Sequence, residues 1–555
     1  MHLLPLLVLA LLVPPLALRA QEAPGARQSP RFDILEYVIE GDTLLGPAVV
    51  ERAVYPFLGP ERTLADAEGA RRALQQAYQD AGFLSVSVLL PPQQVDPAIG
   101  EVRLLVQAAP VSRLRITGAE HFLPSVVREG VPSLAPGSVP QFAEVQEELA
   151  RLAAVAPDRQ ITPILAAGSR PGTLDVELKV EDQLPLHGAV ELNDKQSANT
   201  ERGRLEAAIS YDNLFQRGHG IALNLYTAPT EPAQSSIVSL LYSVPLGGHL
   251  GGPGDRLSLA YTGSDSDTPT PLGGLTVSRG ESWRLRWRDQ LDAPEGLRHA
   301  LSWGLTWRNL RDRNVDVAGF GVEPPSLRYT LLQLDYELDL QGSKPGRATR
   351  LTLGLGLSLP GLNARDVDCF GATVDQFVCK RADSSARFQV LTLNLSHQEP
   401  LGGGSEAWLG RLQVFGQYSD TPLPSSEQAV YGGADTVRGY LEGEQAGDLG
   451  VGLRIEVWAP RWQPTPALAL RVLGFADRAV LRRLYALPAE PVRVQLGSAG
   501  LGLRLDTDGG LAAALDWATV VFDTTRLDRF GRAEPLSGRG AGRAQRWGFS
   551  LRQRF

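Results

Sequence analysis

The sequence predicts a transmembrane β-barrel of about sixteen antiparallel strands, preceded by two small modules of mixed helices and strands. Three observations lead to this fold class. From residue 183 to residue 555, apolar and polar side chains largely alternate with a period of two. After the first twenty residues, no run of apolar residues is long enough for a spanning helix. The chain also ends in phenylalanine after a strongly alternating segment.

The composition and the absence of common motifs argue against several classes of function. The chain has 555 residues and a formal net charge of −8, whereas a nucleic-acid-binding protein needs a basic face, so we expect no nucleic-acid partner. The common sequence signatures of enzymes, a Gly-x-Ser-x-Gly elbow, a Walker loop and a His-Glu-x-x-His helix, do not occur. The seven histidines are scattered without ligand spacing. We therefore expect no catalytic residue, no cofactor and no metal site.

Residues 1–20 are predicted to be an export signal. An apolar run from Leu3 to Leu18 is followed by the small residue Ala20, which suits a cleavage site before Gln21. A permanent anchor is the alternative, but the run is short for a span and contains Pro14 and Pro15. The short segment 21–30 that follows would reach about 15 Å as a helix, about half the hydrocarbon thickness.

Residues 31–109 are predicted to form the first module. An alternating strand from Asp33 to Leu45 precedes a helix, for which Thr63 or Asp66 suits the N-cap and Gly82 the C-cap. Strands at 83–93 and 101–107 complete the module.

The second module, residues 110–182, is predicted to repeat this plan. A strand at 111–118 precedes a short helix at 124–129 and a longer helix at 142–155, and strands near 161–166 and 173–181 close the module.

Two strings in these modules carry a family resemblance. Tyr78-Gln-Asp-Ala-Gly82-Phe83, followed by LPPQQVDPAIGEVRLLVQ, resembles the first POTRA (polypeptide-transport-associated) module of two-partner secretion transporters. SRPGTLDVELKVED at 169–182 resembles the end of the second POTRA module in the same family. The resemblance implies two POTRA modules in the periplasm.

In 183–555 apolar and polar side chains alternate strongly. Trp283, Leu285 and Trp287 oppose three arginines, and the segment 330–341 places leucines opposite acidic residues such as Asp335 and Glu337. A soluble sandwich would alternate too, but strands of about ten residues suit a tilted bilayer span with an apolar outside and a polar lumen. Such a sheet must close, because lipid cannot satisfy an open edge.

The last segment, 546–555, extends this pattern. Trp547, Phe549, Leu551 and Phe555 share one face. This segment resembles the C-terminal signal that the outer-membrane barrel-assembly machinery reads, which implies that this machinery is a partner during biogenesis.

The stretch VYGGADTVRGY, residues 430–440, lies in a long loop, 420–447, between the expected eleventh and twelfth strands. Val437-Arg438-Gly439-Tyr440 resembles the motif of the loop that folds into the barrel in the BamA-like superfamily. The resemblance implies that Arg438 pairs with Asp477 of Gly474-Phe475-Ala476-Asp477, on the thirteenth strand. The alternative is an exposed turn with an incidental arginine.

Cys369 and Cys379 are the two cysteines and fall in another expected outer loop. An even pair in an exported chain favours a disulfide, with free thiols as the alternative. The segment Asp506-Thr507-Asp508-Gly509-Gly510 is similar to part of a calcium loop but lacks its final glutamate, so we interpret it as a hairpin turn.

The resemblance implies a transporter in the outer membrane of a Gram-negative bacterium that secretes a large partner exoprotein, such as a haemolysin or an adhesin. We expect no plug helix in 21–30, which would leave gating to the inward loop. The alternative is a factor that inserts other barrels into the membrane, but relatives with that role usually have three or five POTRA modules. A plain diffusion porin would leave both motifs unexplained.

Overall fold

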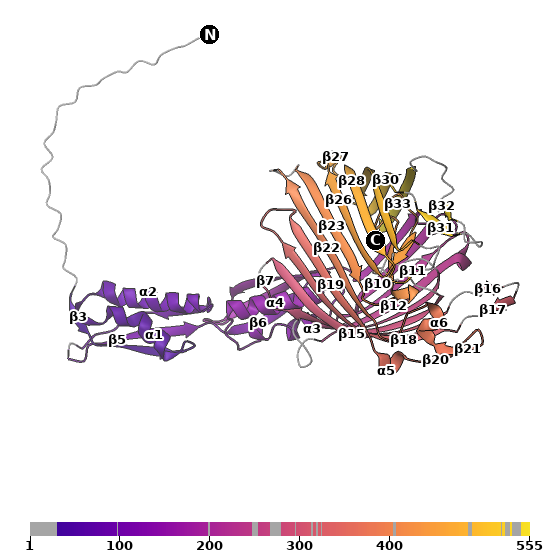
Figure 1. Ribbon diagram of the computed structural model, residues 1–555. Coiled ribbons are helices and arrows are strands. Elements are labelled where there is room, and N and C mark those ends of the chain that lie inside the picture. The colour runs from indigo at the N-terminus through magenta and orange to yellow at the C-terminus, as the bar shows by residue number, and fades with distance from the viewer. Residues whose placement is uncertain are drawn as a thin grey trace, which may run out of the picture. The chain divides into compact units, whose positions relative to one another are not determined.

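The computed structural model describes residues 30–555 (Figure 1), except 97, 198–199, 247–253, 267–278, 295, 312–314, 318–319, 323–324, 403–406, 487–490, 523, 528–532 and 536–544. The predicted signal peptide, 1–20, and nearly all of the segment 21–30 lie outside the described residues. The chain divides into two compact units, and the division passes through the second module, so each part is described by itself.

The first module contains a three-stranded sheet and two helices. In chain order its elements are β1 (Phe32–Ile34), β2 (Glu36–Gly41), α1 (Pro47–Val54), a 3-10 turn (Tyr55–Phe57), β3 (Gly59–Arg62), α2 (Leu64–Asp80), β4 (Val86–Leu89) and β5 (Glu101–Ala108). The sheet order is β2-β5-β4, with β2 parallel to β5, and β1 pairs with β3. The expected continuous strand 33–45 is wrong: Leu35 separates two strands, and helix α1 follows them.

Helix α2 begins and ends where capping chemistry predicts. The backbone N–H of Thr63 donates to Oδ2 of Asp66 at 2.8 Å, and the two residues form a capping box. Gly82 follows the last turn with φ +86°, a conformation in which glycine avoids the penalty of a Cβ. Leu74 and Tyr78, one turn apart, are fully buried against the sheet residues of the module core.

The second module has the predicted order of elements. These are β6 (Val111–Thr117), α3 (Pro124–Glu129), a 3-10 turn (Pro132–Leu134), α4 (Phe142–Val155), β7 (Arg159–Ala167) and β8 (Leu174–Asp182). The strands pair in the order β6-β8-β7, which leaves β6 and β7 at the edges of the sheet.

The remaining residues form a closed antiparallel barrel (Figure 1). Within the described residues its sixteen long strands are β9 (Leu186–Asn193), β10 (Arg204–Leu214), β11 (His219–Thr227), β12 (Ser235–Pro245), β13 (Arg256–Ser266), β14 (Arg279–Leu291), β15 (Leu297–Arg311), β18 (Leu327–Gln341), β19 (Ala348–Ser358), β22 (Gln389–Leu401), β23 (Trp408–Tyr418), β26 (Leu449–Trp458), β28 (Leu468–Arg482), β29 (Arg493–Thr507), β30 (Leu511–Val520) and β33 (Gln545–Arg554). The short β27 (Trp462–Thr465) adds to β28, and β33 pairs with β9 to close the sheet.

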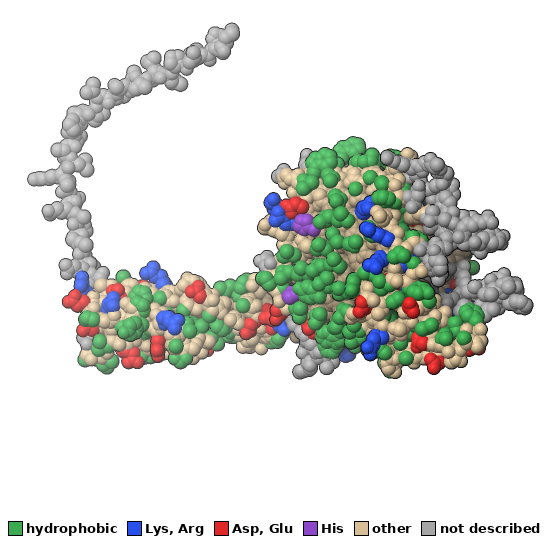
Figure 2. All heavy atoms as spheres, viewed as in Figure 1, with side chains coloured by type: hydrophobic (Ala, Val, Ile, Leu, Met, Phe, Trp, Pro, Cys, Tyr) green, Lys and Arg blue, Asp and Glu red, His purple; other side chains and the backbone are tan. Residues whose placement is uncertain are grey.

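The two faces of the barrel differ as the alternation predicts. Trp283 and Leu285 are 43% and 47% exposed on the outer face, where Figure 2 shows hydrophobic side chains gathered across the strands. On the inner face, the side chains of Arg286 and Asp335 meet at 2.5 Å. Each helix among the described residues is too short or too polar to span a membrane.

Connections at the two ends of the barrel differ in length. Residue 186 follows the second module along the chain, so we call the end where β9 starts the module end and the opposite end the loop end. Because neighbouring strands are antiparallel, the short turns after β10, β18 and β29 lie at the module end. Small additional elements lie in the loop-end connections: β16 (Val315–Val317), β17 (Phe320–Val322), α5 (Pro360–Asn363), β20 (Asp366–Cys369), β21 (Ala372–Asp375), α6 (Gln376–Lys380), β31 (Thr525–Leu527) and β32 (Ala533–Pro535).

Candidate functional site: a loop held inside the barrel

The connection between β23 and β26 folds back on itself and is largely buried. It contains a 3-10 turn (Ser425–Glu427) and the two short antiparallel strands β24 (Ala429–Tyr431) and β25 (Gln445–Gly447). Between these strands, Val437 is fully buried, and Arg438 is 3% exposed. We call residues 420–447 the inward loop, because its side chains meet inward-facing residues of the barrel strands. The loop has the predicted position, between the eleventh and twelfth strands.

Arg438 and Asp477 meet in a bidentate ion pair. Nε and Nη2 of Arg438 donate to Oδ2 and Oδ1 of Asp477 at 2.7 and 2.8 Å. The backbone N–H of Arg438 donates to Oδ2 at 3.1 Å, so a main-chain group also holds the loop to the strand. The Asp477 side chain is fully buried, and a planar guanidinium fork suits a carboxylate in such a place.

Three more residues complete the site: Phe475, which belongs to the predicted Gly474–Asp477 motif, and Arg454 and Glu456, which were not predicted from the sequence. Glu456 on β26 lies 2.8 Å from Nη1 of Arg438, and Arg454 approaches both Glu456 and Asp477, at 3.5 and 3.7 Å. The guanidinium carbon of Arg438 lies 3.5 Å from the centroid of the Phe475 ring. The site therefore contains two arginines and two carboxylates, which balance in charge, as buried ions require.

Glycine at position 439 lets the loop approach the wall closely. Its φ of +89° disfavours any other residue, and an added Cβ would lie 3.0 Å from Cγ2 of Val520 and 3.1 Å from Cβ of Ala518. The next residue, Tyr440, donates its hydroxyl to the carbonyl of Phe522 at 2.6 Å and accepts from the N–H of Gly497 at 3.0 Å. The Val437–Tyr440 motif thus contacts the strands β28 to β30.

The tip of the inward loop, residues 434–442, also contacts the connection after β9. The N–H of Glu442 donates to the carbonyl of Gln196 at 2.9 Å, and Nζ of Lys195 lies 3.2 Å from Oδ2 of Asp435. Burial and the neighbouring carboxylate of Asp435 raise the pKa of Glu442 to about 7, although the N–H of Ala434 and the charges of Lys195 and Arg546 oppose the rise.

The two ends of the inward loop, at Glu427 and next to Asp448, have buried ion pairs of their own, and we call them its root. Glu427 pairs with Arg308 on β15 and accepts from the hydroxyl of Tyr329 at 2.6 Å. Asp448, just after β25, pairs with Arg381, whose Nη2 donates to its Oδ2 at 2.8 Å. These pairs attach the root to strands across the barrel from β28 and to the connection between β19 and β22.

Two cavities flank the inward loop within the barrel. One, of about 880 Å³, is lined mainly by β23 to β33 and β9, and the other, of about 570 Å³, mainly by β14 to β23. Lys195, Asp435 and Glu442 line both cavities. The tip of the loop therefore divides the lumen.

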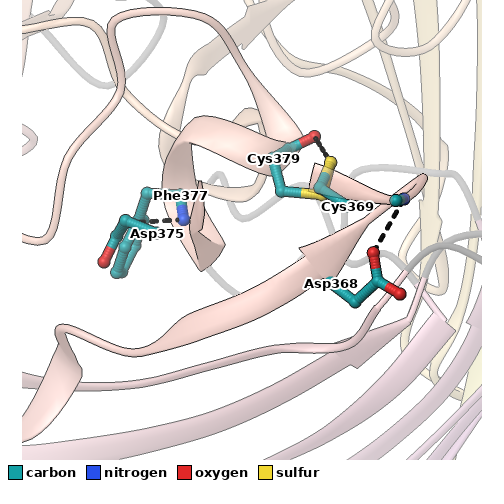
Figure 3. Close-up of a disulfide and its surroundings, with 6 residues drawn as sticks. Asp368, Cys369, Asp375, Phe377 and Cys379 are labelled. Atoms are coloured by element: carbon teal, nitrogen blue, oxygen red, sulfur yellow. Dashed lines mark hydrogen bonds between the residues drawn. A yellow bond between two sulfur atoms is a disulfide. The ribbon is translucent and has the colours of Figure 1, made fainter. Parts of the chain in front are cut away.

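Cys369 and Cys379 are bonded, with 5.7 Å between their Cα atoms (Figure 3). They join the end of β20 to helix α6, whose first turn is capped by Asp375, which accepts from the N–H of Phe377 at 2.9 Å. The same connection supplies Arg381, so the bonded segment adjoins the root of the inward loop.

The residues of the expected C-terminal signal share the outer face of β33. Trp547, Phe549, Leu551 and Phe555 are 55%, 49%, 44% and 68% exposed. Their exposure suits a partner that approaches from outside the barrel.

One group of side chains among the described residues has the spacing of metal ligands. Single ligand atoms of Asp158, His187 and Asp212 lie within 4.8 Å of one another. Nε2 of His187 is 3.1 Å from Oδ2 of Asp158 and 4.0 Å from Oδ2 of Asp212, which an ordinary ion pair also explains. The three residues come from separate segments, so spacing along the chain could not reveal the group. We assign it no function.

Comparison with known protein families shows to which family the chain belongs. The model of the family described as haemolysin secretion/activation protein ShlB/FhaC/HecB matches residues 172–505, which is more than half of the chain. The chain belongs to this family. A second model, the ShlB-type POTRA domain, matches residues 32–108, which are the first α/β module.

Relatives of known name are distant but cover most of the chain. The outer membrane transporter CdiB of Dickeya dadantii (strain 3937) is 24% identical over 80% of this chain and 75% of its own length. The heme/hemopexin transporter protein HuxB of Haemophilus influenzae (strain 86-028NP) is 21% identical over 82% of this chain and 77% of its own.

Solved structures share the fold. CdiB from Escherichia coli aligns with a TM-score of 0.61 and 18% identity over 97% of this chain and 93% of its own. BamA from Haemophilus ducreyi lacking POTRA domains 1–3 aligns with a TM-score of 0.54 and 14% identity over 95% of this chain and all of its own.

The predicted family, fold class and location are therefore confirmed. The chain is a member of a two-partner secretion family of outer-membrane transporters, with POTRA domains in the periplasm and a barrel of sixteen strands. The module end of the barrel is accordingly its periplasmic end, and the loop end is extracellular.

Proposed function

We propose that this chain secretes one large exoprotein, made separately, from the periplasm to the cell exterior, and that the inward loop gates its passage. The observation that carries the proposal is the buried site around Arg438. A polar loop of this length inside a barrel divides the lumen, so an extended polypeptide can pass only when the loop shifts.

The POTRA domains capture the unfolded cargo. Strand β7 is an edge strand of its sheet and exposes Ile164 and Leu165, which are 46% and 55% exposed. An extended segment of cargo can add to such an edge through main-chain hydrogen bonds and place alternate side chains against the exposed residues. Capture of this kind is tolerant of sequence, as a long unfolded chain requires.

The barrel then conducts the cargo. Its lumen offers polar groups on both walls, such as the Arg286–Asp335 pair, which keep an extended chain hydrated. The pairs of Arg438 with Asp477 and Glu456 hold the inward loop in the resting position. Folding of the cargo outside the cell supplies the drive, since the periplasm provides no nucleotide.

Biogenesis of the transporter uses the barrel-assembly machinery of the outer membrane. The apolar outer face of β33, which ends in Phe555, is the surface that this machinery reads. Because β33 also closes the barrel against β9, its recognition would precede closure.

A comparative proteome of a deletion strain tests the proposed function. Culture supernatant and outer membrane are measured together, with the wild-type chain restored on a plasmid as the control. We expect the loss of one large protein from the supernatant while the amounts of other barrels stay unchanged. Depletion of many barrels from the membrane, with secretion otherwise intact, would instead assign the chain to barrel assembly.

A further inference from the structure

We propose that an arginine-rich wall at the periplasmic end of the lumen binds acidic segments of the transported polypeptide. The inference rests on the proposed function and names the chemistry of the cargo that the barrel receives first. The wall consists of Arg411, Arg471 and Arg504 around Trp458, and we call it the basic wall.

The basic wall lies at the periplasmic end of the barrel. Arg411 and Arg471 are each the fourth residue of a strand that starts there, β23 and β28. Arg504 is the fourth residue from the end of β29, which finishes there. All three line the cavity of about 880 Å³. A chain that enters from the periplasm would meet them before it reaches Arg438.

Two of the three guanidinium groups lie near one aromatic ring. The guanidinium carbon of Arg411 lies 4.4 Å from the centroid of the Trp458 ring, and that of Arg504 lies 5.7 Å from it. Arg471 is directly opposite Arg504 in the register of β28 and β29. Like charges in opposite positions destabilise a sheet, and here Asp516 offsets the charge of Arg504.

Among the described residues, a carboxylate neutralises one of the three arginines of the basic wall. Among the described residues, no carboxylate oxygen lies within 4.0 Å of the guanidinium nitrogens of Arg411 or Arg471, whereas Arg504 is paired with Asp516 at 2.7 Å. Glu456 is opposite Arg411 in the register, but its carboxylate meets Arg438 and the indole N–H of Trp458. Nε of Arg471 is buried without a hydrogen-bond partner.

The facing part of the cavity leaves room for a ligand. On β30 and β33 the lining includes the small residues Ala512, Ala514, Ala518, Gly548 and Ser550, between the larger Asp516, Arg546 and Arg552. The small side chains at these positions leave space in the lumen in front of the arginines. The cavity is large enough for several side chains of an extended peptide.

Two arginines of the opposite wall each have a carboxylate partner. There, Arg286 pairs with Asp335 at 2.5 Å, and Arg288 pairs with Glu337 at 3.2 Å. Each of these two arginines has its own carboxylate on β18. Arg284 on the same wall has a buried Nε without a hydrogen-bond partner, as Arg471 does.

Carboxylate side chains fit this wall best. A guanidinium fork binds a carboxylate through two parallel hydrogen bonds, and the remaining donors of Arg411 and Arg471 are free to do so among the described residues. The indole face of Trp458 adds an apolar surface for the stem of a glutamate. We commit to acidic stretches of unfolded polypeptide, because the proposed cargo enters at this end.

Peptide binding to the purified full-length chain in detergent micelles tests the inference. The probes are fluorescently labelled, unstructured peptides of about twenty residues that are rich in glutamate, in glutamine or in lysine, measured by anisotropy at low salt. We expect the glutamate peptide to bind at least tenfold more tightly than the other two. Its affinity should fall as salt is added, because screening weakens ion pairs.

Substitutions locate the binding to the basic wall. Arg411→Gln with Arg471→Gln should weaken binding of the glutamate peptide at least tenfold, while Arg411→Lys with Arg471→Lys should keep it within about threefold because the charge remains. Arg279→Gln, a matched change of charge at the extracellular end of β14, should leave binding unchanged. If the double glutamine variant does not fold, as judged by heat-modifiable migration, Arg471→Gln alone is measured and should weaken binding severalfold.

The outcomes separate this inference from the proposed function. Equal binding of the three peptides, or unchanged affinity of the glutamine variants, would overturn the basic wall even if the deletion strain loses an exoprotein. The opposite combination is also informative. If the purified chain binds the glutamate peptide through both arginines, but deletion of the gene leaves the supernatant unchanged, the basic wall is supported and secretion is contradicted.

Discussion

Nε and Nη2 of Arg438 meet both carboxylate oxygens of Asp477, although the two residues are 39 positions apart in the chain. One belongs to a loop and the other to the barrel wall, so the pair decides where the loop sits. Both side chains are almost fully buried, and loss of either charge would leave the other without its partner.

Asp477→Asn should release the inward loop while the barrel stays assembled. The amide keeps the size of the side chain but removes its charge, which leaves Arg438 and Arg454 facing Glu456 alone. We expect secretion to fall at least tenfold and the variant to migrate as a folded barrel in heat-modifiability gels. Asp339→Asn, on the lumen face of β18, is the matched control and should secrete normally. Normal secretion by Asp477→Asn would contradict the importance of this carboxylate.

Gly439→Ala tests the close approach of loop and wall. The added methyl group would lie about 3 Å from Val520 and Ala518, and the residue would have to adopt a φ of +89°. We expect limited proteolysis to cut the inward loop faster than in the wild type. In Gly361→Ala, an added Cβ has nothing within 4 Å, so this control should be cut at the wild-type rate. Wild-type protection of the Gly439 variant would show that the contact is loose.

Docking of the loop tip should strengthen as the pH falls from 7 to 5. Burial, together with the carboxylate of Asp435, raises the pKa of Glu442 to about 7, whereas a released loop would expose the group at its ordinary value of 4.5. Between these values the docked state binds more protons, so lower pH favours docking, by at most about tenfold per pH unit.

Channel conductance in planar bilayers between pH 5 and 8 measures this effect. The wild-type chain should conduct less as the pH falls, and the slope should vanish in Glu442→Gln, which is neutral at every pH. Glu231→Gln, an exposed change in the connection between β11 and β12, should keep the wild-type slope. The same slope in the Glu442 variant would assign the pH dependence to another group.

Loss of the disulfide should loosen the outer segment without unfolding the barrel. Closing a loop of this size reduces the conformational entropy of the unfolded chain. In the loop-entropy account this raises the free energy of unfolding by about 3 kcal/mol. Because Arg381 of the same segment pairs with Asp448, Cys369→Ser with Cys379→Ser should increase hydrogen exchange at residues 360–388 and at the root of the inward loop. Exchange confined to 366–379 would show that the segment and the root are independent.

Local patterns were enough to predict much of the fold. Helices α3 and α4 have the predicted bounds, because their apolar spacing and end residues agree. The strand predicted at 33–45 failed because alternation alone does not show that β1, before Leu35, pairs with β3, whereas β2, after it, pairs with β5. Sheet partners, unlike helix caps, are distant in the chain.

The candidate site was predictable only in part. The family resemblance implies that the Val437–Tyr440 motif pairs with the Gly474–Asp477 motif, and the structure brings Arg438 and Asp477 together. Arg454 and Glu456 have the alternation of lumen-facing residues, which was the available signal, but that pattern does not indicate which loop they meet. Asp435 and Lys195 meet through a fold in the loop tip that no spacing along the chain encodes.

Secretion by an Arg438→Ala strain tests the central claim most directly. The amount of exoprotein in the supernatant is measured together with the amount of folded barrel in the outer membrane, and Arg438→Lys is compared alongside. The account predicts a normal amount of barrel, at least tenfold less exoprotein for alanine, and partial recovery for lysine, which keeps the charge but not the fork. Normal secretion by Arg438→Ala at a normal level of barrel would contradict the proposed role of the inward loop.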